Sequence, residues 1–212
     1  MPVPPDFATR KLSYRHVDAA KLMRIFKTLP TAHPAPVYYG DGSRSDYRFD
    51  PPSAAVGPDR FGVMYAAYDL ETCFAETITR EDNRKPLKFG ALAVSHSVQV
   101  LPRYVANLDA DLPLRLADVT DIGLYSLGAD AAEFNSANYP VDTQPWALEI
   151  YRRPETVDGI YYRSRFLNGR IAVAIFERGG LRVGLRPSYV TKLTSHDMYT
   201  DVLRNLNISL LP

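Results

Sequence analysis

Strand-like and helix-like segments alternate along this sequence without a regular βαβ rhythm. Residues 61–67 form an apolar run that predicts a short buried strand, followed by a helix over 70–80 for which Asp69 is in place as N-cap. Residues 157–166 and 170–178 predict two strands around the turn Leu-Asn-Gly-Arg. This irregular order predicts a mixed or antiparallel α+β fold rather than a doubly wound parallel sheet.

Other segments carry weaker signals. Residues 143–154 predict a helix, because Thr or Asp can cap it, one proline is tolerated in its first turn and a second proline ends it. Residues 87–102 are strand-like, and residues 112–128 favour the start of a helix followed by a loop. Residues 18–26 fit either a helical turn or the start of a strand, and residues 188–212 a mixture of helix and strand.

Composition narrows the class of protein. With 212 residues, 46% of them hydrophobic and 23% charged, the chain is expected to form one globular domain over 1–212. The 25 basic and 24 acidic residues leave a net charge of +1, which gives no long-range field to attract nucleic acid or an anionic membrane. No secretion signal or membrane span is visible, and the single cysteine fits a reducing compartment, so we expect a cytoplasmic location.

Sites of several common kinds have no support in the residues. The four histidines are not at ligand spacing and no cysteine pair exists, so no metal is expected. Cys73 has acidic and apolar neighbours, which raise a thiol pKa, and is interpreted as a small core residue rather than a nucleophile. Neither of the glycine-rich phosphate-binding motifs that precede a helix occurs.

A few charged residues leave two interpretations open. The loop over 27–60 holds Arg44, Arg48 and Arg60, and its Gly, Ser and Arg residues fit a phosphate site or an ordinary loop. Arg24 lies among large apolar residues, either as a stem that covers the core or as a guanidinium at the floor of a cleft. Glu76 either forms an ordinary pair with an arginine four residues later or meets a positive charge in a functional site.

Five pieces of the sequence follow one another in a specific order. They are Leu-Met-Arg-Ile-Phe with Arg24, Tyr-Arg-Phe-Asp-Pro-Pro with Arg48, the strand with Tyr65, Cys-Phe-Ala-Glu-Thr-Ile with Glu76, and Asp-Gly-Ile-Tyr-Tyr-Arg-Ser-Arg-Phe with Ser164. Taken together, they resemble the RES domain, the toxin half of bacterial RES–Xre toxin–antitoxin pairs. The family is named for an Arg, a Glu and a Ser, and the resemblance covers about residues 24–176.

This chain departs from the family pattern in three places. Asp50 stands where the family commonly has asparagine, and the stretch over 52–60 lengthens the loop between Arg48 and Tyr65. The segment between Glu76 and Ser164 is also long. Ser164 itself is expected in the middle of a strand, where an outward polar side chain is the ordinary alternative to a functional one.

The resemblance implies an ADP-ribosyltransferase-like mixed core of two packed β-sheets with flanking helices, NAD in the cleft between them, and an Xre-type antitoxin that occludes the site. It implies that NAD is cleaved at its nicotinamide–ribose bond. Rigid, forked guanidinium groups suit the pyrophosphate, so Arg24 and Arg48 are the expected ligands. Tyr65 is expected to wall the nicotinamide and ribose, and Ser164 to bond the nicotinamide amide or a phosphate. Glu76 is expected to stabilise the positive charge that develops on the ribose.

The acceptor of the ADP-ribose stays open among a protein, water and phosphate, with a cytosolic protein favoured. One rival is a two-carboxylate glycosidase or nucleosidase that pairs Glu76 with Glu149 or Asp50. Another is a non-enzymatic module whose partner docks on 198–211. The sequence leaves the oligomeric state and the stoichiometry with the antitoxin undetermined.

Overall fold

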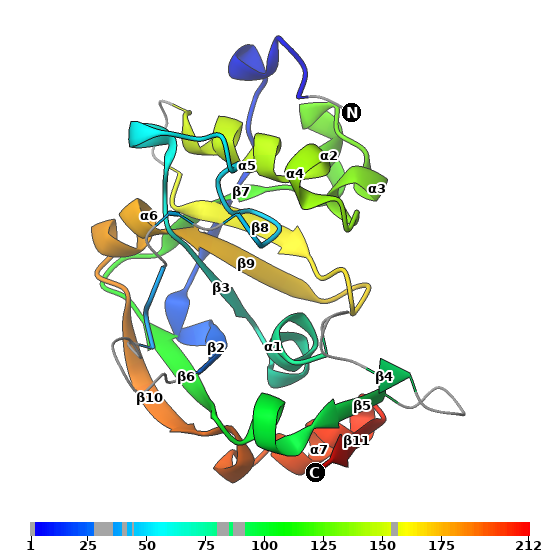
Figure 1. Ribbon diagram of the computed structural model, residues 1–212. Coiled ribbons are helices and arrows are strands. Elements are labelled where there is room, and N and C mark those ends of the chain that lie inside the picture. The colour runs from blue at the N-terminus through cyan, green and yellow to red at the C-terminus, as the bar shows by residue number, and fades with distance from the viewer. Residues whose placement is uncertain are drawn as a thin grey trace.

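A computed structural model describes residues 3–27, 36–39, 42–43, 45–79, 85–86, 92–153 and 157–212. The fold is mixed α+β, with one large curled sheet, one small sheet and helices around them (Figure 1), as the sequence predicted. The large sheet has the order β1-β7-β8-β9-β3-β2-β6-β10, and the small one β11-β5-β4. The strands are β1 (Tyr14–Val17), β2 (Met23–Lys27), β3 (Val63–Ala67), β4 (Lys85–Pro86), β5 (Leu92–Ser95), β6 (Arg103–Asp109), β7 (Leu114–Asp118), β8 (Gly159–Arg163), β9 (Ile171–Phe176), β10 (Arg186–Lys192) and β11 (Ile208–Leu211).

The large sheet is joined weakly at its middle. β3 pairs with β9 from Val63↔Phe176 to Ala67↔Ala172, and β2 pairs with β6 along its whole length. Between β2 and β3, by contrast, Met23↔Ala67 is the one pair among the described residues. The sheet therefore consists of two well-paired halves that meet at a single point, with β2 and β3 facing each other across the join.

Seven α-helices surround the sheets: α1 (Leu70–Thr77), α2 (Asp121–Leu127), α3 (Ala131–Phe134), α4 (Tyr139–Asp142), α5 (Gln144–Tyr151), α6 (Glu177–Arg182) and α7 (Tyr199–Asn205) in the described part of the chain. Figure 1 shows α2 to α5 gathered above β8, at one end of the molecule, and α7 beside the small sheet at the other. No helix among the described residues is both long and apolar enough to cross a membrane.

Helix α1 forms as the sequence predicts. The carboxylate of Asp69 accepts a hydrogen bond from the backbone N–H of Thr72 at 2.8 Å, which satisfies one free donor of the first turn. Leu70, Cys73 and Phe74 are buried on the face toward the sheet. The thiol of Cys73 donates to the carbonyl of Met23, and burial raises its pKa. Cys73 is thus the core residue that its neighbours indicated, and it ties α1 to β2.

The apolar residues of the central strands divide between the two faces of the sheet. Ile160 and Tyr162 of β8 belong to the larger core cluster, which also contains Phe74 and Trp146. Tyr161, one residue away, packs against the second cluster on the other face. This alternation follows from the pleat of a strand, and it places Tyr162 on the same side as helix α1.

Asp158 and Gly159 lie at the start of β8. Asp158 is fully buried, and its carboxylate accepts hydrogen bonds from the backbone N–H of Arg115 and from the guanidinium of Arg182, each at 2.7 Å or less. A Cβ added to Gly159 would lie 2.1 Å from the carbonyl oxygen of Ala174 on β9, and one added to Gly179 would lie 2.3 Å from the Cα of Asp158. These contacts fix the start of β8 against β7, β9 and α6.

Several of the local predictions hold, and others do not. The hairpin of β8 and β9 and the helix α5 are confirmed, with Pro145 in the first turn of α5. Residues 112–128 are not a helix start followed by a loop but β7 followed by α2, since Leu114 and Leu116 alternate into the core as strand residues do. Of the predicted strand over 87–102, residues 87–91 lie outside the described part of the chain. In the rest, β5 ends at Ser95, whose hydroxyl accepts from the backbone N–H of Val98 and starts a π-helical turn over 96–100.

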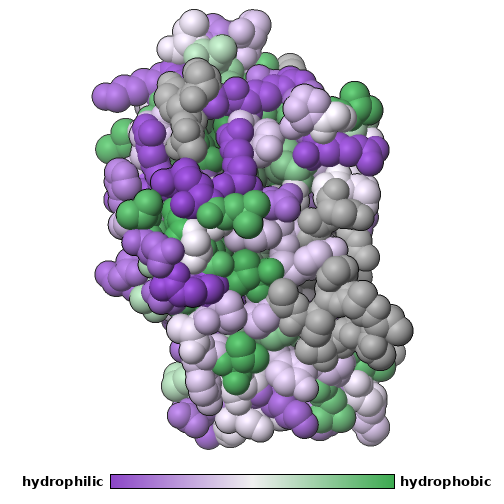
Figure 2. All heavy atoms as spheres, turned by 90° about the vertical axis from the view of Figure 1, so that its left-hand side faces the viewer, coloured by the Kyte–Doolittle hydropathy of each residue, from purple (hydrophilic) through white to green (hydrophobic). Residues whose placement is uncertain are grey.

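The surface on the side of α6 and β10 is mixed in character. Figure 2 shows that hydrophobic side chains on this face form small groups separated by hydrophilic residues. A cavity of about 420 Å³ lies at α6, lined by Val37, Tyr38, Tyr39, Glu177, Gly180, Leu181, Gly184 and Leu185.

Candidate functional site

Arg48 lies in an irregular loop, and its side chain is only 5% exposed. The guanidinium donates from Nη1 to the carbonyl of Arg163 at 3.1 Å and from Nη2 to Oδ1 of Asn135 at 3.4 Å. It lies over the rings of Tyr162 and Phe49, with its carbon 4.9 and 5.2 Å from their centroids. Burial lowers the pKa of Arg48, and the nearby carboxylate of Glu76 opposes this shift.

Glu76 lies in the last turn of α1 and points to the turn that follows β8. Its Oε1 accepts hydrogen bonds from the hydroxyl of Ser164 at 2.6 Å and from the backbone N–H of Arg165 at 3.2 Å. No described residue bonds Oε2. The alternative partner of Glu76, Arg80, lies outside the described residues. Glu76 is therefore held by one oxygen, which leaves the other for a further partner.

Ser164 was predicted in the middle of a strand, and this is wrong. Strand β8 ends at Arg163, and Ser164 begins the turn toward β9. Its hydroxyl oxygen accepts hydrogen bonds from the backbone N–H groups of Phe166 and Leu167, at 3.2 and 3.1 Å, while its proton goes to Glu76. The side chain is 2% exposed, so Ser164 builds the turn and orients the carboxylate at the same time.

These contacts bring Arg48 and Glu76 to consecutive residues of one turn. Arg48 bonds the carbonyl of Arg163, and Glu76 bonds the side chain of Ser164. Although their charges influence each other, no ion pair within 4.0 Å joins them. The turn therefore presents a guanidinium and a carboxylate side by side without letting them neutralise each other.

Tyr65 of β3 supports the loop that carries Arg48. Its hydroxyl donates to Oδ1 of Asp50 at 3.1 Å and accepts from the backbone N–H of Phe49 at 2.8 Å. The second oxygen of Asp50 accepts from the backbone N–H of Tyr47. Burial raises the pKa of Tyr65 well above its ordinary value and that of Asp50 to about 6. The aspartate that replaces the family's asparagine thus uses both of its oxygens as acceptors in this loop.

Arg24 lies on β2, beside the join of the sheet. Its guanidinium donates to the carbonyls of Tyr38 at 2.8 Å and Pro36 at 3.4 Å, and no contact brings it to Glu76 or Ser164. Burial lowers its pKa to about 10, an effect opposed by the nearby Tyr39, Cys73 and Tyr47.

Arg24 and Arg48 share one property. Neither has a carboxylate partner among the described residues, whereas Arg15, Arg152 and Arg182 are each paired with aspartate. Because it is costly to remove a cation from water without a counter-ion, an anion would stabilise both guanidinium groups, that of the buried Arg48 and that of the partly buried Arg24.

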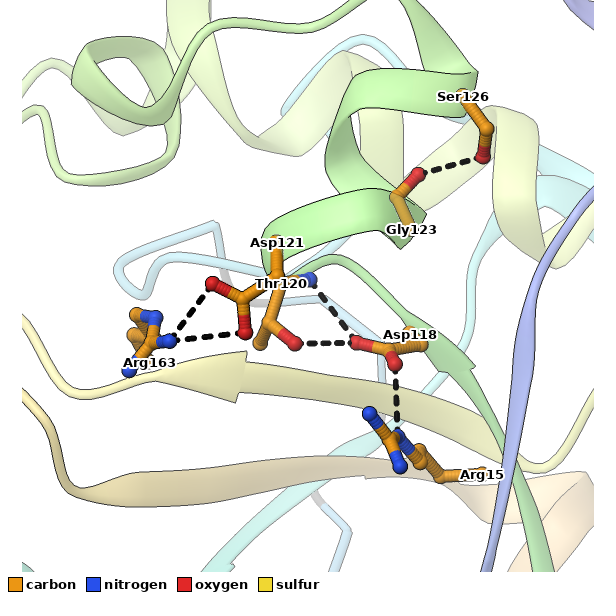
Figure 3. A network of polar contacts seen from close by, with 7 residues as sticks. All are labelled: Arg15, Asp118, Thr120, Asp121, Gly123, Ser126 and Arg163. Carbon is orange, nitrogen blue, oxygen red and sulfur yellow. Dashed lines mark hydrogen bonds and ion pairs between the residues drawn. The ribbon is translucent and has the colours of Figure 1, made fainter.

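A cavity of about 180 Å³ adjoins Arg48, and its lining includes Phe134, Asn135, Tyr162 and Arg163. One of its walls is the start of α2, which is fixed by the network in Figure 3. There Arg163 donates from one nitrogen to both oxygens of Asp121, at 2.8 and 2.9 Å, and Asp118 joins Thr120 to Arg15. The side chain of Arg163 thus braces α2, while its carbonyl holds Arg48.

Sequence reasoning did not single out two residues that contact Arg48. Tyr162 lies in the predicted strand over 157–166, and strand alternation from Ile160 places its side chain on the same side as the site. Asn135 follows the short helix α3, and no sequence signal indicates it.

Two further expectations concern carboxylates and metals. Glu149, a possible second acid, pairs with Arg152, which also binds Asp59, and none of these residues contacts Glu76. Asp50 has both oxygens engaged within its own loop. In the part of the chain that the structure describes, no group of three or more His, Cys, Asp or Glu could hold a metal ion.

Comparisons with known proteins concern the fold and the family of this chain. A chain from the crystal structure of the M. tuberculosis MbcT-MbcA toxin-antitoxin complex superimposes with a TM-score of 0.57 at 11% identity, covering 97% of this chain and 98% of that chain. This likeness concerns the fold alone. No curated protein matches the sequence. The RES domain family matches residues 21–191, a span that contains Arg24, Arg48, Tyr65, Glu76 and Ser164, and the chain therefore belongs to the RES domain family.

Proposed function

We propose that this chain is the toxin of a toxin–antitoxin pair, which binds NAD, cleaves its nicotinamide–ribose bond and transfers ADP-ribose to a cytosolic protein. The observation that carries the proposal is the turn after β8, where Arg48 and Glu76 lie close together but unpaired. NAD has an anionic pyrophosphate and develops positive charge on its ribose when nicotinamide leaves. A separated guanidinium and carboxylate match these two charges.

Glu76 is the proposed catalytic residue. With Oε1 anchored by Ser164 and Arg165, the free Oε2 faces the ribose and stabilises the oxocarbenium-like transition state. An acid held before the reaction begins needs no reorganisation as the charge develops. Ser164, which the sequence analysis expected to bond NAD, is assigned here to the orientation of Glu76, because its proton is already given to that carboxylate.

Arg48 and Arg24 are the proposed ligands of the pyrophosphate. Each guanidinium has at most two bonds to oxygen acceptors of the protein, so N–H groups remain for phosphate oxygens. An anion there would offset the cost of removing two guanidinium groups from water, wholly for Arg48 and partly for Arg24, without a carboxylate partner among the described residues. The ring of Tyr65 would contact the nicotinamide side of the substrate, while its hydroxyl keeps the Arg48 loop in place.

The structural likeness to a toxin–antitoxin complex favours a cognate antitoxin, and the family resemblance favours one of Xre type that covers this site. Such a toxin acts in the cytoplasm of the cell that makes it. A glycohydrolase or a phosphorylase that only depletes NAD is the alternative, because water and phosphate can take the place of the protein acceptor after the same bond is broken. The two-carboxylate glycosidase loses support, since Glu149 and Asp50 are engaged elsewhere.

The test uses NAD labelled in its adenylate part, the purified chain and a lysate of cells that lack the antitoxin. We expect the label on protein, with nicotinamide released in equal amount. Label in free ADP-ribose or its phosphate would select the NAD-depleting alternative. Label that stays in intact NAD would refute both. Glu76→Gln is the matched inactive variant and Glu149→Gln the matched active one, because each removes one charge from a helix and only the first touches the turn after β8.

A further inference from the structure

The loop that carries Arg48 is held by two side chains from a distant part of the sequence. The amide nitrogen of Gln144 donates to the carbonyls of Ser45 at 2.8 Å and Tyr47 at 3.1 Å, and its oxygen accepts from the hydroxyl of Ser45 at 2.9 Å. The hydroxyl of Thr143 donates to the carbonyl of Arg48 itself at 2.5 Å. These bonds join residues 95–99 positions apart, so they fix the loop against α5.

Both residues are unusual for the places that they occupy. Gln144 and Thr143 are 0% exposed, although glutamine and threonine are mostly found at protein surfaces. Three bonds use both donors of the Gln144 amide and its oxygen. Thr143 stands at the N-cap of α5 but makes no capping bond, and the alternative acceptor for its hydroxyl, the carbonyl of Tyr139, is 3.5 Å away. The two side chains therefore serve the loop rather than their own helix.

The loop has no regular structure of its own that could keep Arg48 in place. Over 45–50 the backbone forms bends and a turn, with one internal bond from Asp50 to the carbonyl of Tyr47 at 3.3 Å. From the side of β3 it is held by the hydroxyl of Tyr65, and from the side of α5 by Thr143 and Gln144. Among the described residues, Thr143 is the one whose side chain bonds the backbone of Arg48 itself, while Gln144 bonds the residues just before it.

We propose that Thr143 and Gln144 are positioning residues, which set where the Arg48 guanidinium stands relative to Glu76. The inference rests on the proposed function, because it gives Arg48 a substrate to hold. It assigns no contact with that substrate to either residue. Misplacement of a binding group by about 1 Å can reduce a rate by about 10²-fold. Since the guanidinium keeps its own bonds to Arg163 and Asn135, we expect about a tenfold loss of kcat/KM when either α5 contact is removed.

The test compares Thr143→Val and Gln144→Leu, which keep side-chain size, with Thr79→Val. Thr79 is buried just after α1, and its hydroxyl bonds only the carbonyl of Ala75 among the described residues. We expect both α5 variants to lose about tenfold in kcat/KM for NAD, mostly through kcat, with Thr143→Ser restoring the wild-type value and Thr79→Val leaving it unchanged. A wild-type kcat/KM in both α5 variants would overturn the proposal.

A double-mutant cycle separates positioning from general destabilisation. In an Arg48→Lys background, the α5 variants should lower kcat/KM little further, because the ammonium group of lysine has no planar set of donors that must be aligned with the substrate. An equal loss in both backgrounds would show a merely structural role and overturn the inference.

If the wild-type chain cleaves no NAD, the proposed function fails, and hydrogen exchange then tests whether the α5 contacts hold the loop. Faster exchange of the amides of Tyr47, Phe49 and Asp50 in Gln144→Leu than in Thr79→Val would support the α5 contacts, and equal exchange would reject them.

Discussion

Arg48 and Arg24 occupy similar situations in two different regions of the molecule. Both guanidinium groups donate to backbone carbonyls, and burial lowers the pKa of both. Neither has a carboxylate partner among the described residues. Arg48, however, stands over two aromatic rings beside the anchored carboxylate of Glu76. Arg24 is surrounded by carbonyls, phenols and a thiol, and with a pKa of about 10 it keeps its charge at neutral pH.

The difference separates two uses of a buried cation. A guanidinium and an unpaired carboxylate that lie close together can stabilise a negative and a developing positive charge at the same time. This suits a substrate whose charge changes during the reaction. A guanidinium among neutral groups only attracts an anion and holds it. We therefore expect the region of Arg48 to govern the rate of the reaction and the region of Arg24 to govern binding. Four predictions probe this contrast.

The largest effect is expected for Glu76→Gln. The variant keeps the shape and an acceptor for Ser164 but removes the charge that we propose faces the ribose. We expect kcat to fall by about 10³-fold with little change in KM, which is the size seen when one preorganised electrostatic group is lost. Steady-state kinetics with labelled NAD measure it, with Glu149→Gln as control. A loss confined to KM would show that Glu76 binds substrate rather than stabilises the transition state.

Next come the two arginines themselves. Arg48→Lys should lower kcat/KM by about 10²-fold, because lysine cannot span the carbonyl of Arg163, Asn135 and a phosphate at once. Arg24→Lys should cost about tenfold and raise KM only. Arg152→Lys, at an exposed ion pair, is the control. Equal losses of kcat in the Arg24 and Arg48 variants would remove the contrast between the two regions.

Asp50 offers a test through the dependence of stability on pH. Its pKa of about 6 in the folded protein lies above the ordinary value near 3.8 that it has when unfolded. The folded state therefore holds the proton more tightly, and the resulting stability is present below about pH 4 and lost as the pH rises through 6. We expect the free energy of unfolding to fall by about 2 kcal/mol between pH 4 and 7 relative to Asp50→Asn. Denaturant melts of both proteins give the difference, and parallel pH profiles would contradict it.

The smallest effect is expected for Ser164→Ala. Oε1 of Glu76 keeps the backbone N–H of Arg165, so the carboxylate loses one of its two anchors but not its charge. We expect kcat to fall about tenfold, with KM nearly constant, because the acid is less well oriented. A rise of KM alone would instead return Ser164 to the role of an NAD ligand. Ser126→Ala, whose hydroxyl bonds only within α2, serves as control.

The sequence predicts the parts of this site that depend on local order. Periodicity and capping indicated the helix that carries Glu76, and the turn residues indicated the hairpin that carries Ser164. The resemblance supplied Arg48 and Tyr65, which lie in the same network.

Contacts between distant segments were not predictable in the same way. Ser164 was placed mid-strand because nothing in the residues Tyr-Tyr-Arg-Ser-Arg-Phe marks where β8 stops pairing with β9. Three hydrogen bonds of the Ser164 hydroxyl fix the turn in which the chain leaves the strand, and one of them goes to Glu76, in a helix 88 residues away in the sequence. Gln144 and Asn135 were missed for the same reason, since their partners lie about 90 or more positions away.

The buried Asp158–Gly159 pair has a consequence for how mutational data on this chain should be interpreted. Positions 159 and 179 leave no space for a side chain. Position 158 supplies the carboxylate that Arg182 and the backbone of Arg115 share. A saturation screen for loss of toxicity would score them as intolerant as Glu76, although none of them contacts the turn that holds the two charges. Substitutions at these three sites would abolish toxicity because the protein fails to fold, not because a catalytic group is lost. Measuring the yield of soluble folded protein for each variant separates the two causes.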